Sequence, residues 1–263
     1  VIWRWSRGTP GGGKAPFGRP GASGGGFGGG GVLLIHFEDP PDVVMDRIAL
    51  HVQGLLVAAA KQAIAGQTPW LSLSREETEV FGNRENIFSA NDLRLNVMPD
   101  RKRHAVEMVS RRIASLLGGL ELFHANGMSM AAAMAVAEAR AQVGALEGNP
   151  LKRVVVDYLN KAELSPQVIR DWGVAGARAQ DAERVKQFAE RWNLVAVVIQ
   201  QENDSGDPFD TRQALHKSQL YLQLVRQDTN GSYQLQVLKA NWGQVGAKVN
   251  LQLLPTFMTF RVE

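Results

Sequence analysis

The residues best suited to chemistry lie where a run of β-branched residues ends at an acid. Val154, Val155 and Val156 are followed by Asp157. Such a run is typical of a buried strand in a parallel sheet, and open α/β sheets bind ligands at the carboxyl ends of their strands. An acid there can hold the water ligands of Mg²⁺, a cation that takes few protein ligands. The other interpretation is an ordinary turn after a strand, where Asp is common.

A second group of candidates is rich in glycine. Residues 8–14 read Gly-Thr-Pro-Gly-Gly-Gly-Lys, with four residues between Gly8 and the Gly13-Lys14 pair. This is the spacing of a phosphate-binding loop, whose backbone N–H groups point at phosphate oxygens. Residues 8–31 hold thirteen of the 27 glycines, and with Pro16 and Pro20 they cannot form the helix that normally follows such a loop. The stretch could therefore also be a flexible linker or not native to the chain.

Composition sets broad limits on the class of protein. With 263 residues, of which 44% are hydrophobic, the chain fits one large α/β domain or two small ones. The absence of cysteine excludes disulfides, thiolate chemistry and zinc held by cysteine. The net charge of +3 permits a nucleic-acid partner without requiring one. No uninterrupted apolar run is long enough to span a membrane, and the start at Val1 without a signal peptide suggests a fragment of a longer protein.

Hydrophobic patterns predict that strands and helices alternate through most of the chain. Residues 57–100 fit neither pattern, and the tail from residue 218 to 263 predicts a β meander within the same single domain. The predicted strands are 1–7, 32–37, 120–123, 154–157 and 194–199, followed in the tail by 220–225, 233–240, 248–254 and 257–262; the predicted helices are 42–56, 105–117, 129–146 and 174–192.

In their order along the chain, five segments resemble the motifs of the RecA-like motor domain of DnaB-family replicative helicases, including the related phage enzymes. They are the phosphate-loop spacing at residues 8–14, the strand Val32–Glu38, the strand Val154–Asn160, the strand Val197–Asn203 and the turn Lys239–Gly243. The resemblance implies an α/β fold with a RecA-like P-loop NTPase core. In that fold a mostly parallel twisted sheet has flanking helices and a C-terminal antiparallel β extension.

The resemblance also implies a site for ATP and Mg²⁺. Glu38 would be the general base, Asp157 would hold the metal's water shell, Gln201 would sense the γ-phosphate and Lys239 would reach a neighbouring subunit. The other interpretations are a solvated turn acid for Glu38 and a polar strand cap for Gln201. The residues expected to bind the nucleotide are Gly8, Gly11, Gly12, Gly13, Lys14 and Ala15.

Two positions depart from the motifs of the family. Ala15 stands where a Ser or Thr hydroxyl normally binds Mg²⁺, and Asn241 stands where the family carries an arginine finger. A second alignment of the phosphate loop, at residues 18–21, contains Arg19 but no lysine and lies too close to the next strand.

Single-stranded DNA would bind to two loops that face the central channel of a ring, Lys161–Arg178 and Glu202–Lys217. The alternative is that the charges of these loops are merely solvated. A denser basic stretch at Arg101–His104 and Arg111-Arg112 is expected to line the outside of a helix, and His36 and His124 are expected to be core residues. The expected DNA-binding cations are Lys161, Arg170, Arg178, Arg212 and Lys217.

The function implied by the resemblance is an ATP-dependent helicase motor that works as a homo-oligomeric, hexameric ring on single-stranded DNA. A primase or a helicase loader would be a further partner, no membrane would be involved, and the location would be the cytoplasm of a bacterial or phage-infected cell, or an organelle. The alternative is a catalytically reduced paralogue that serves in assembly or DNA binding. Ala15, Asn241 and the glycine-filled stretch in place of the first helix favour the paralogue. The residues that favour the enzyme are Lys14, Glu38, Asp157 and Gln201.

Overall fold

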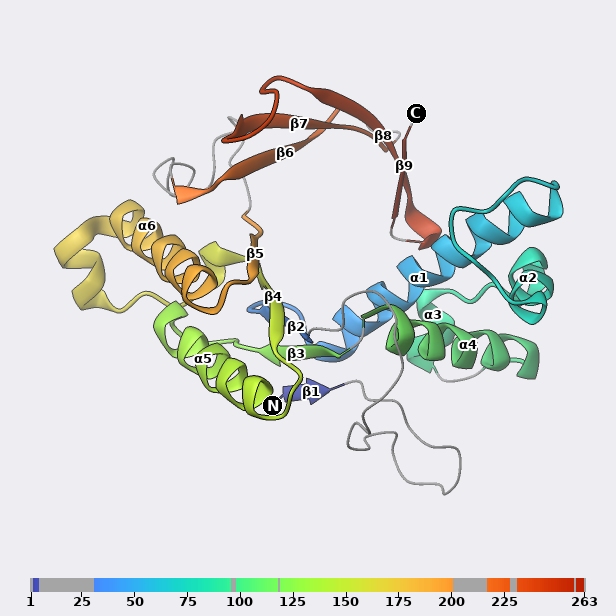
Figure 1. The fold of residues 1–263 in the computed structure, drawn as a ribbon, viewed down its shortest axis with the longest axis horizontal. Helices are drawn as coiled ribbons and strands as arrows, with labels where there is room; N and C mark the ends of the chain where they lie inside the picture. Colours follow the sequence, from blue (N-terminus) through green and yellow to red (C-terminus); the bar gives the residue numbers. More distant parts are fainter. Residues whose placement is uncertain are drawn as a thin grey trace. The chain divides into compact units, whose positions relative to one another are not determined.

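The structure is a computed structural model, and it describes residues 2–4, 31–95, 98–117, 119–200, 217–227, 231–257 and 259–262. The chain divides into two compact units, which Figure 1 shows as ribbons coloured along the sequence. The first unit comprises Val1–Pro41, Leu117–Leu222 and Val237–Ala247, and the second comprises Asp42–Leu116, Gln223–Gln236 and Lys248–Glu263.

A five-stranded sheet forms the centre of the first unit. Its strand order is β1-β3-β2-β4-β5, where β1 is Ile2–Arg4, β2 is Gly31–His36, β3 is Leu120–His124, β4 is Leu151–Asp157 and β5 is Val195–Val198. Strands β3, β2, β4 and β5 are parallel, whereas β1 runs antiparallel to β3. The parallel sheet predicted from the runs of apolar, β-branched residues is therefore confirmed.

Helices α5 (Met130–Leu146) and α6 (Pro166–Trp192) pack against each other and against this sheet. The hydroxyls of Ser129 and Ser165 accept hydrogen bonds from the first turns of α5 and α6, which satisfies amides that have no partner within the helix. The core between helices and sheet is apolar, with Leu33, Ile35, Val154, Val156, Ala133, Ala137, Val185 and Phe188 among its buried members.

The second unit contains the segment that the sequence pattern left unassigned. Helix α1 (Pro41–Ile64) extends beyond its predicted end, and α2 (Arg75–Gly82), α3 (Ala90–Leu95) and α4 (Asp100–Leu117) follow, with a short 3-10 turn η1 (Arg84–Asn86). The buried side chain of Gln53 joins α1 to this segment, because it donates to the carbonyl of Phe88 and accepts from the amide of Phe88, both at 2.9 Å. Within the unit, Gly54 is required by close packing, since a Cβ there would lie 2.6 Å from Cβ of Phe257.

Four antiparallel strands form a separate sheet in the order β6-β7-β8-β9. They are β6 (Leu220–Arg226), β7 (Ser232–Ala240), β8 (Lys248–Leu254) and β9 (Thr259–Val262), with a 3-10 turn η3 (Pro255–Phe257) before the last. This arrangement confirms the predicted β meander.

By length and composition, α1 could cross a membrane, and it is the one helix of the described residues for which that holds. Half of its apolar stretch is buried inside the protein, and core helices of proteins outside membranes pass the same test.

Candidate functional site

The carboxyl ends of β2 and β4 bring two of the predicted site residues to neighbouring positions. His36 is paired with Asp157 in the strand register, and the amide of Phe37 donates to the carbonyl of Asp157 at 2.9 Å. Glu38 follows Phe37 directly, so both acids lie at the same edge of the sheet. The Glu38 side chain is 46% exposed, so its carboxylate is accessible to a ligand, and Asp157 is half-buried.

A short turn after Asp157 completes this edge. The 3-10 turn η2 (Leu159–Lys161) is anchored to β5, because the amide of Leu159 donates to the carbonyl of Ile199 at 3.0 Å. The ammonium group of Lys161 lies 3.3 Å from Oε1 of Glu38. The structure thus joins a predicted DNA-binding cation to the predicted general base by an ion pair. We call Glu38, Asp157 and η2 the acidic edge.

The strand β5 ends beside the acidic edge, with Val198 paired to Val156 in the register. The next residues are Ile199, whose amide donates to the carbonyl of Val156 at 2.9 Å, and Gln200, which is half-buried. Gln201, the predicted γ-phosphate sensor, lies outside the described residues. Gln200 is therefore the last residue after β5 whose position the structure describes, and the role of Gln201 stays a prediction.

The predicted phosphate loop, residues 8–15, also lies outside the described residues. The structure does describe β1, the strand that precedes this loop in the chain. β1 is antiparallel to β3 and its last residue, Arg4, is paired with Glu121, near the amino end of β3. Phosphate loops normally leave a strand at the carboxyl edge of the sheet. Here the chain leaves β1 at the opposite edge from Asp157, which departs from that arrangement.

Lys239, predicted to reach into a neighbouring subunit, lies near the end of β7. Its ammonium group is half-buried and donates to the carbonyl of Ser218 at 2.6 Å. The amide of Asn241 donates to the carbonyl of Gln219 at 2.9 Å. The side chain of Lys239 thus contacts its own chain in the single subunit described.

The cations predicted to bind DNA differ in their surroundings, and one expectation is corrected. The prediction that residues 161–178 form a loop is wrong, because Pro166–Trp192 is helical with a kink at Gly173. Arg178 is only 6% exposed and pairs with Asp181 inside the unit, so it is not an accessible cation. Arg170 is exposed on α6, and Lys217 is partly exposed and lies 3.0 Å from Glu183. Arg212 lies outside the described residues.

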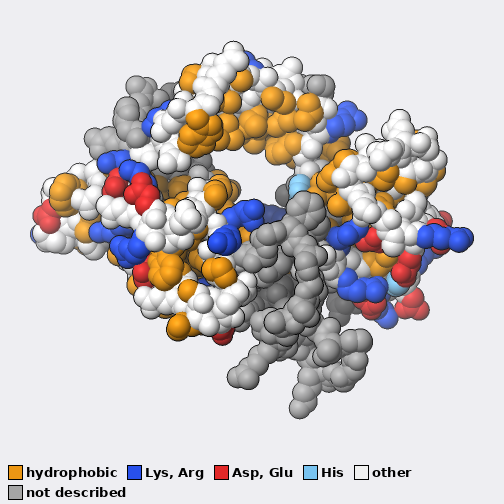
Figure 2. All heavy atoms as spheres, viewed as in Figure 1, with side chains coloured by type: hydrophobic (Ala, Val, Ile, Leu, Met, Phe, Trp, Pro, Cys, Tyr) orange, Lys and Arg blue, Asp and Glu red, His pale blue; other side chains and the backbone are white. Residues whose placement is uncertain are grey.

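The basic stretch on α4 is largely neutralised by acids of the same unit. Three side chains of α4 form ion pairs with α2, η1 and α3, and His104 contacts Glu76 at 3.0 Å. Figure 2 shows basic and acidic side chains interspersed over this part of the surface. The pairs are Arg101–Glu85, Lys102–Asp92, His104–Glu76 and Arg112–Glu77. The stretch therefore links α4 to α2, η1 and α3 within the second unit. It lies on the surface of a helix, as predicted.

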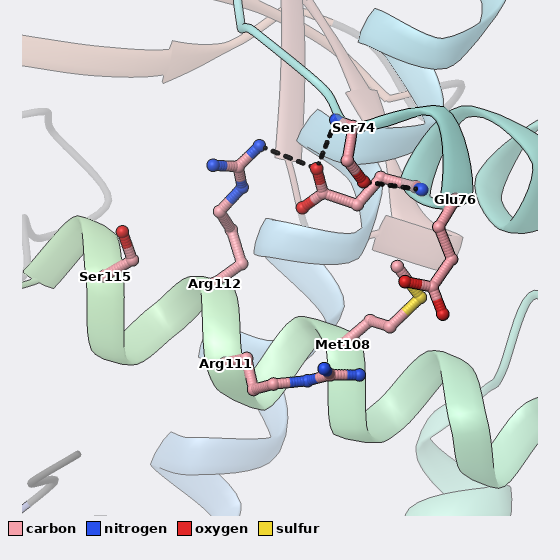
Figure 3. A pocket seen from close by; sticks show the side chains of 7 residues that line it. Ser74, Glu76, Met108, Arg111, Arg112 and Ser115 are labelled. Atoms are coloured by element: carbon pink, nitrogen blue, oxygen red, sulfur yellow. Dashed lines mark hydrogen bonds and ion pairs between the residues drawn. The ribbon is translucent and has the colours of Figure 1, made fainter.

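A hollow of about 250 Å³ lies between α2 and α4 and is lined by both signs of charge. In Figure 3 the guanidinium groups of Arg111 and Arg112 point in different directions. Arg112 donates to Glu77 at 3.1 Å and to the carbonyl of Ser72, whereas no ion pair within the described residues involves Arg111. The hollow is thus part of the ion-paired contact between two helices.

The two predicted core histidines form a stacked pair. The rings of His36 and His124 have centroids 4.9 Å apart and planes inclined by 4°. Burial lowers the pKa of His36, and the neighbouring His124 lowers this pKa further, while Asp39 opposes the change. Within the described residues no group of three or more His, Cys, Asp or Glu side chains could hold a metal ion. The prediction that these histidines belong to the core is therefore confirmed for His36, which is 1% exposed.

The comparisons with known proteins were made by sequence and by structure. No protein-family model and no curated protein matches the chain in sequence. The ATPase domain of G40P matches in structure with a TM-score of 0.60 at 15% identity, covering 88% of this chain and 74% of that one. A DnaB-like replicative helicase, described with its interactions with primase, matches with a TM-score of 0.57 at 15% identity.

The chain has a RecA-like fold. Its structural neighbours are the ATPase domains of DnaB-like replicative helicases, as the sequence motifs had indicated. The match covers 88% of this chain but only 51% of the DnaB-like helicase, so this chain spans about half the length of that protein.

One exposed aromatic residue on α6 was missed by the sequence analysis. Trp172, just before the kink in α6, is 60% exposed, and its neighbours Ile169 and Val174 are each 39% exposed. The signal was present in the sequence, since Trp172 stands two residues from Arg170 within the stretch predicted to bind DNA. Aromatic rings beside cations are typical of surfaces that bind single-stranded nucleic acid.

Proposed function

We propose that this chain is the motor domain of a ring-forming helicase that hydrolyses ATP with Mg²⁺ and moves along single-stranded DNA. The observation that carries the proposal is the acidic edge, where Glu38 and Asp157 follow two neighbouring parallel strands joined by the bond from Phe37 to Asp157. The likeness of the fold to helicase ATPase domains supports a motor of this kind.

The two acids would have different roles in hydrolysis. Glu38 would accept a proton from the water that attacks the γ-phosphate, and the exposed position of its carboxylate suits this task. Asp157 would hold water ligands of Mg²⁺. When bound, this cation neutralises charge that develops on the phosphates. Because no described cluster could hold a metal by itself, nucleotide oxygens and waters would have to complete its coordination.

Further contacts to the nucleotide would come from Lys239 and from residues outside the described part of the chain. Lys14 would bind the β- and γ-phosphates, and the N–H groups of residues 8–15 would cradle them. Gln201 would report the presence of the γ-phosphate. Lys239 would have to exchange its bond with Ser218 for a contact across the ring.

Single-stranded DNA would bind near the acidic edge through phosphate-directed cations and one aromatic ring. Of the five predicted cations we retain Lys161, Arg170, Arg212 and Lys217, and we remove Arg178 because it is buried. Trp172 would stack on a base, an interaction without sequence preference that suits a motor.

The expected assembly is a hexameric ring of copies of this chain in the cytoplasm of a bacterial or phage-infected cell. A primase is a reasonable further partner, since the DnaB-like helicase that matches in fold is described with its interactions with primase.

The decisive experiment compares Glu38→Gln with Asp157→Asn. We expect Glu38→Gln to abolish ATP hydrolysis while leaving ATP affinity within about threefold of wild type, because the amide cannot accept the proton. Asp157→Asn should also weaken ATP binding, and only when Mg²⁺ is present. Glu163→Gln, at an exposed acid just after η2, is the matched control and should leave both properties unchanged. The same phenotype for Glu38→Gln and Asp157→Asn would contradict the division of roles.

A catalytically reduced paralogue is the second candidate, and the direction of β1 favours it. The strand before residues 8–15 leads away from the acidic edge, and Ala15 and Asn241 lack the groups that bind Mg²⁺ and stabilise transferred phosphate. Wild-type protein that binds single-stranded DNA but shows no Mg²⁺-dependent ATP turnover would establish this candidate in place of the motor.

A further inference from the structure

A buried cation on α6 contacts the turn that follows Asp157. The side chains of Arg178 and Asp181 are 7% and 5% exposed, and Nη1 of Arg178 lies 3.4 Å from Oδ2 of Asp181. The other terminal nitrogen, Nη2, donates to the carbonyl of Asn160 at 2.8 Å. Asn160 is the middle residue of η2. A guanidinium group this deeply buried is costly without partners, and these two contacts, made by its two terminal nitrogens, fix its position.

The turn η2 has contacts on three sides. The amide of Leu159 binds the carbonyl of Ile199 after β5, and Lys161 pairs with Glu38 after β2. Arg178 supplies the third contact, from α6, and of the three it is the one made by a buried charge. Removing it would take away the hydrogen bond from α6 to the backbone of η2, while the buried side chain of Leu159 still packs in the core.

We propose that Arg178 is a positioning residue, whose guanidinium group holds the carbonyl of Asn160 and thereby fixes the turn that carries Lys161 and follows Asp157. This inference rests on the proposed hydrolysis of a nucleoside triphosphate at the acidic edge. It gives a function to a residue that the sequence placed on a DNA-binding loop.

The chemistry of arginine explains why this residue type is needed. Its planar fork has separate N–H groups, so one can bind a carboxylate while another binds a carbonyl. Lysine carries a single ammonium group on a flexible stem and cannot reproduce both directions at once. Asp181 is kept in place by a second partner, because Nη1 of Arg184 lies 3.1 Å from its Oδ1. Burial raises the pKa of Asp181, and the two arginines oppose that rise.

Packing of α6 does not depend on the bond to Asn160. Val185 and Phe188 are 1% and 4% exposed and anchor the helix in the core, and Ser165 caps its first turn. A change that removes only the bond to Asn160 should therefore affect the turn more than the stability of the unit.

The test compares Arg178→Lys with Arg184→Lys in the full chain. Both variants alter an arginine beside Asp181, but Arg184 is 45% exposed and has no described bond to η2, which makes it the matched control. Amide hydrogen exchange should become faster at Lys161 and Ala162 in Arg178→Lys and stay at the wild-type rate in Arg184→Lys. The kcat for ATP should fall about 10- to 100-fold in Arg178→Lys with KM changed less than about threefold, since small misplacements of reacting groups cost this much.

The outcomes separate this inference from the proposed function. Exchange at η2 that is the same in Arg178→Lys and wild type overturns the inference, as does a wild-type kcat in that variant. Wild-type protein without ATP turnover overturns the proposed function, and the exchange measurement then decides alone whether Arg178 holds the turn. If Arg178→Lys fails to fold, the double variant Arg178→Met with Asp181→Asn removes the guanidinium group without leaving a buried carboxylate unpaired, and the same faster exchange and lower kcat are expected.

Discussion

The ammonium group of Lys161 lies 3.3 Å from Oε1 of Glu38. The first residue was predicted to bind DNA and the second to act as general base. Both side chains are partly exposed, at 40% and 46%, and ion pairs of this kind contribute little to stability and exchange readily. A DNA phosphate that draws Lys161 away would therefore free the carboxylate of Glu38 at little cost, which would link DNA binding to hydrolysis.

Lys161→Ala should show whether Lys161 both binds DNA and restrains the carboxylate of Glu38. We expect weaker binding of single-stranded DNA, with the slope of log affinity against log salt reduced by about 0.7 for the lost phosphate contact. ATP turnover without DNA should rise, and its stimulation by DNA should shrink. The control is Lys152→Ala, at an exposed lysine near the start of β4, the strand that precedes η2. It should change neither the salt slope of DNA binding nor the ATP turnover. An unchanged salt slope in Lys161→Ala would remove this residue from the DNA path.

The phosphate-loop assignment can be tested against its alternative. Lys14→Ala should lower the affinity for ATP by about tenfold or more, because a charge-assisted hydrogen bond contributes about 1.5–3 kcal/mol. Arg19→Ala, in the second alignment at residues 18–21, should leave affinity near the wild-type value. The measurement is a titration with a fluorescent ATP analogue in the presence of Mg²⁺. If only Arg19→Ala weakens binding, the loop belongs at residues 18–21.

The sequence predicted the parallel strands from their runs of apolar, β-branched residues, and in β2 and β4 these runs reach the core through Leu33, Ile35, Val154 and Val156. Asp157 is the last residue of β4, and Glu38 lies two residues after the end of β2, so both acids follow the predicted runs at the same edge of the sheet. The order of the motifs then led to the helicase-like fold without any residue-level information on packing.

The parts that were mispredicted or left unassigned depend on tertiary contacts, or on prolines and glycines that do not mark loops in this fold. The resemblance to the family placed a loop at residues 161–178, but Pro166 stands in the first turn of α6, where proline is favoured, and Ser165 acts as the cap. Gly173, with a φ of 65°, separates two helical segments of α6, and the second segment corresponds to the predicted helix 174–192. The start of α2 had a readable signal, since Ser74 and Glu77 form a capping box. The burial of Arg178 could not be predicted, because sequence does not reveal which face of a helix meets the turn η2.

Two adjacent arginines on α4 allow a matched test of the ion-paired surface. Arg112→Met should lower the free energy of unfolding by about 1–3 kcal/mol, since it leaves Glu77 and the carbonyl of Ser72 without their partner in a mostly buried position. Arg111→Met should change it by less than about 0.5 kcal/mol, as is usual for exposed positions. Unfolding in urea, followed by circular dichroism, gives both values. Equal losses would mean that the helix propensity of α4 matters more than its ion pairs.

The buried histidine pair predicts a dependence of stability on acid. Because burial lowers the pKa of His36 below its ordinary value of 6.5, the unfolded chain binds a proton more readily than the folded one. Stability from this group is therefore complete at neutral pH and above, and it is lost as pH falls below about 6.5. The groups close to His36 are His124 and Asp39. The melting temperature should drop between pH 7.5 and 5.5, and less steeply in His36→Phe, which keeps an aromatic ring against His124. Equal pH dependence in both proteins would exclude His36 as the cause.

Two tryptophans of equal exposure provide the sharpest test of the DNA path. Trp172 and Trp70 are each 60% exposed, but Trp172 belongs to the same exposed first part of α6 as Arg170, whereas Trp70 belongs to the second unit. Stacking of a base on an aromatic ring contributes about 1–3 kcal/mol, so Trp172→Ala should weaken binding of single-stranded DNA by about 5- to 150-fold. Trp70→Ala should leave the affinity unchanged. Fluorescence anisotropy of a labelled oligothymidylate at fixed salt measures both, and a second series with a mixed-sequence oligonucleotide should give the same ratio, because stacking does not read sequence. If Trp70→Ala weakens binding and Trp172→Ala does not, DNA follows the second unit, and Arg111 becomes the cation to change next.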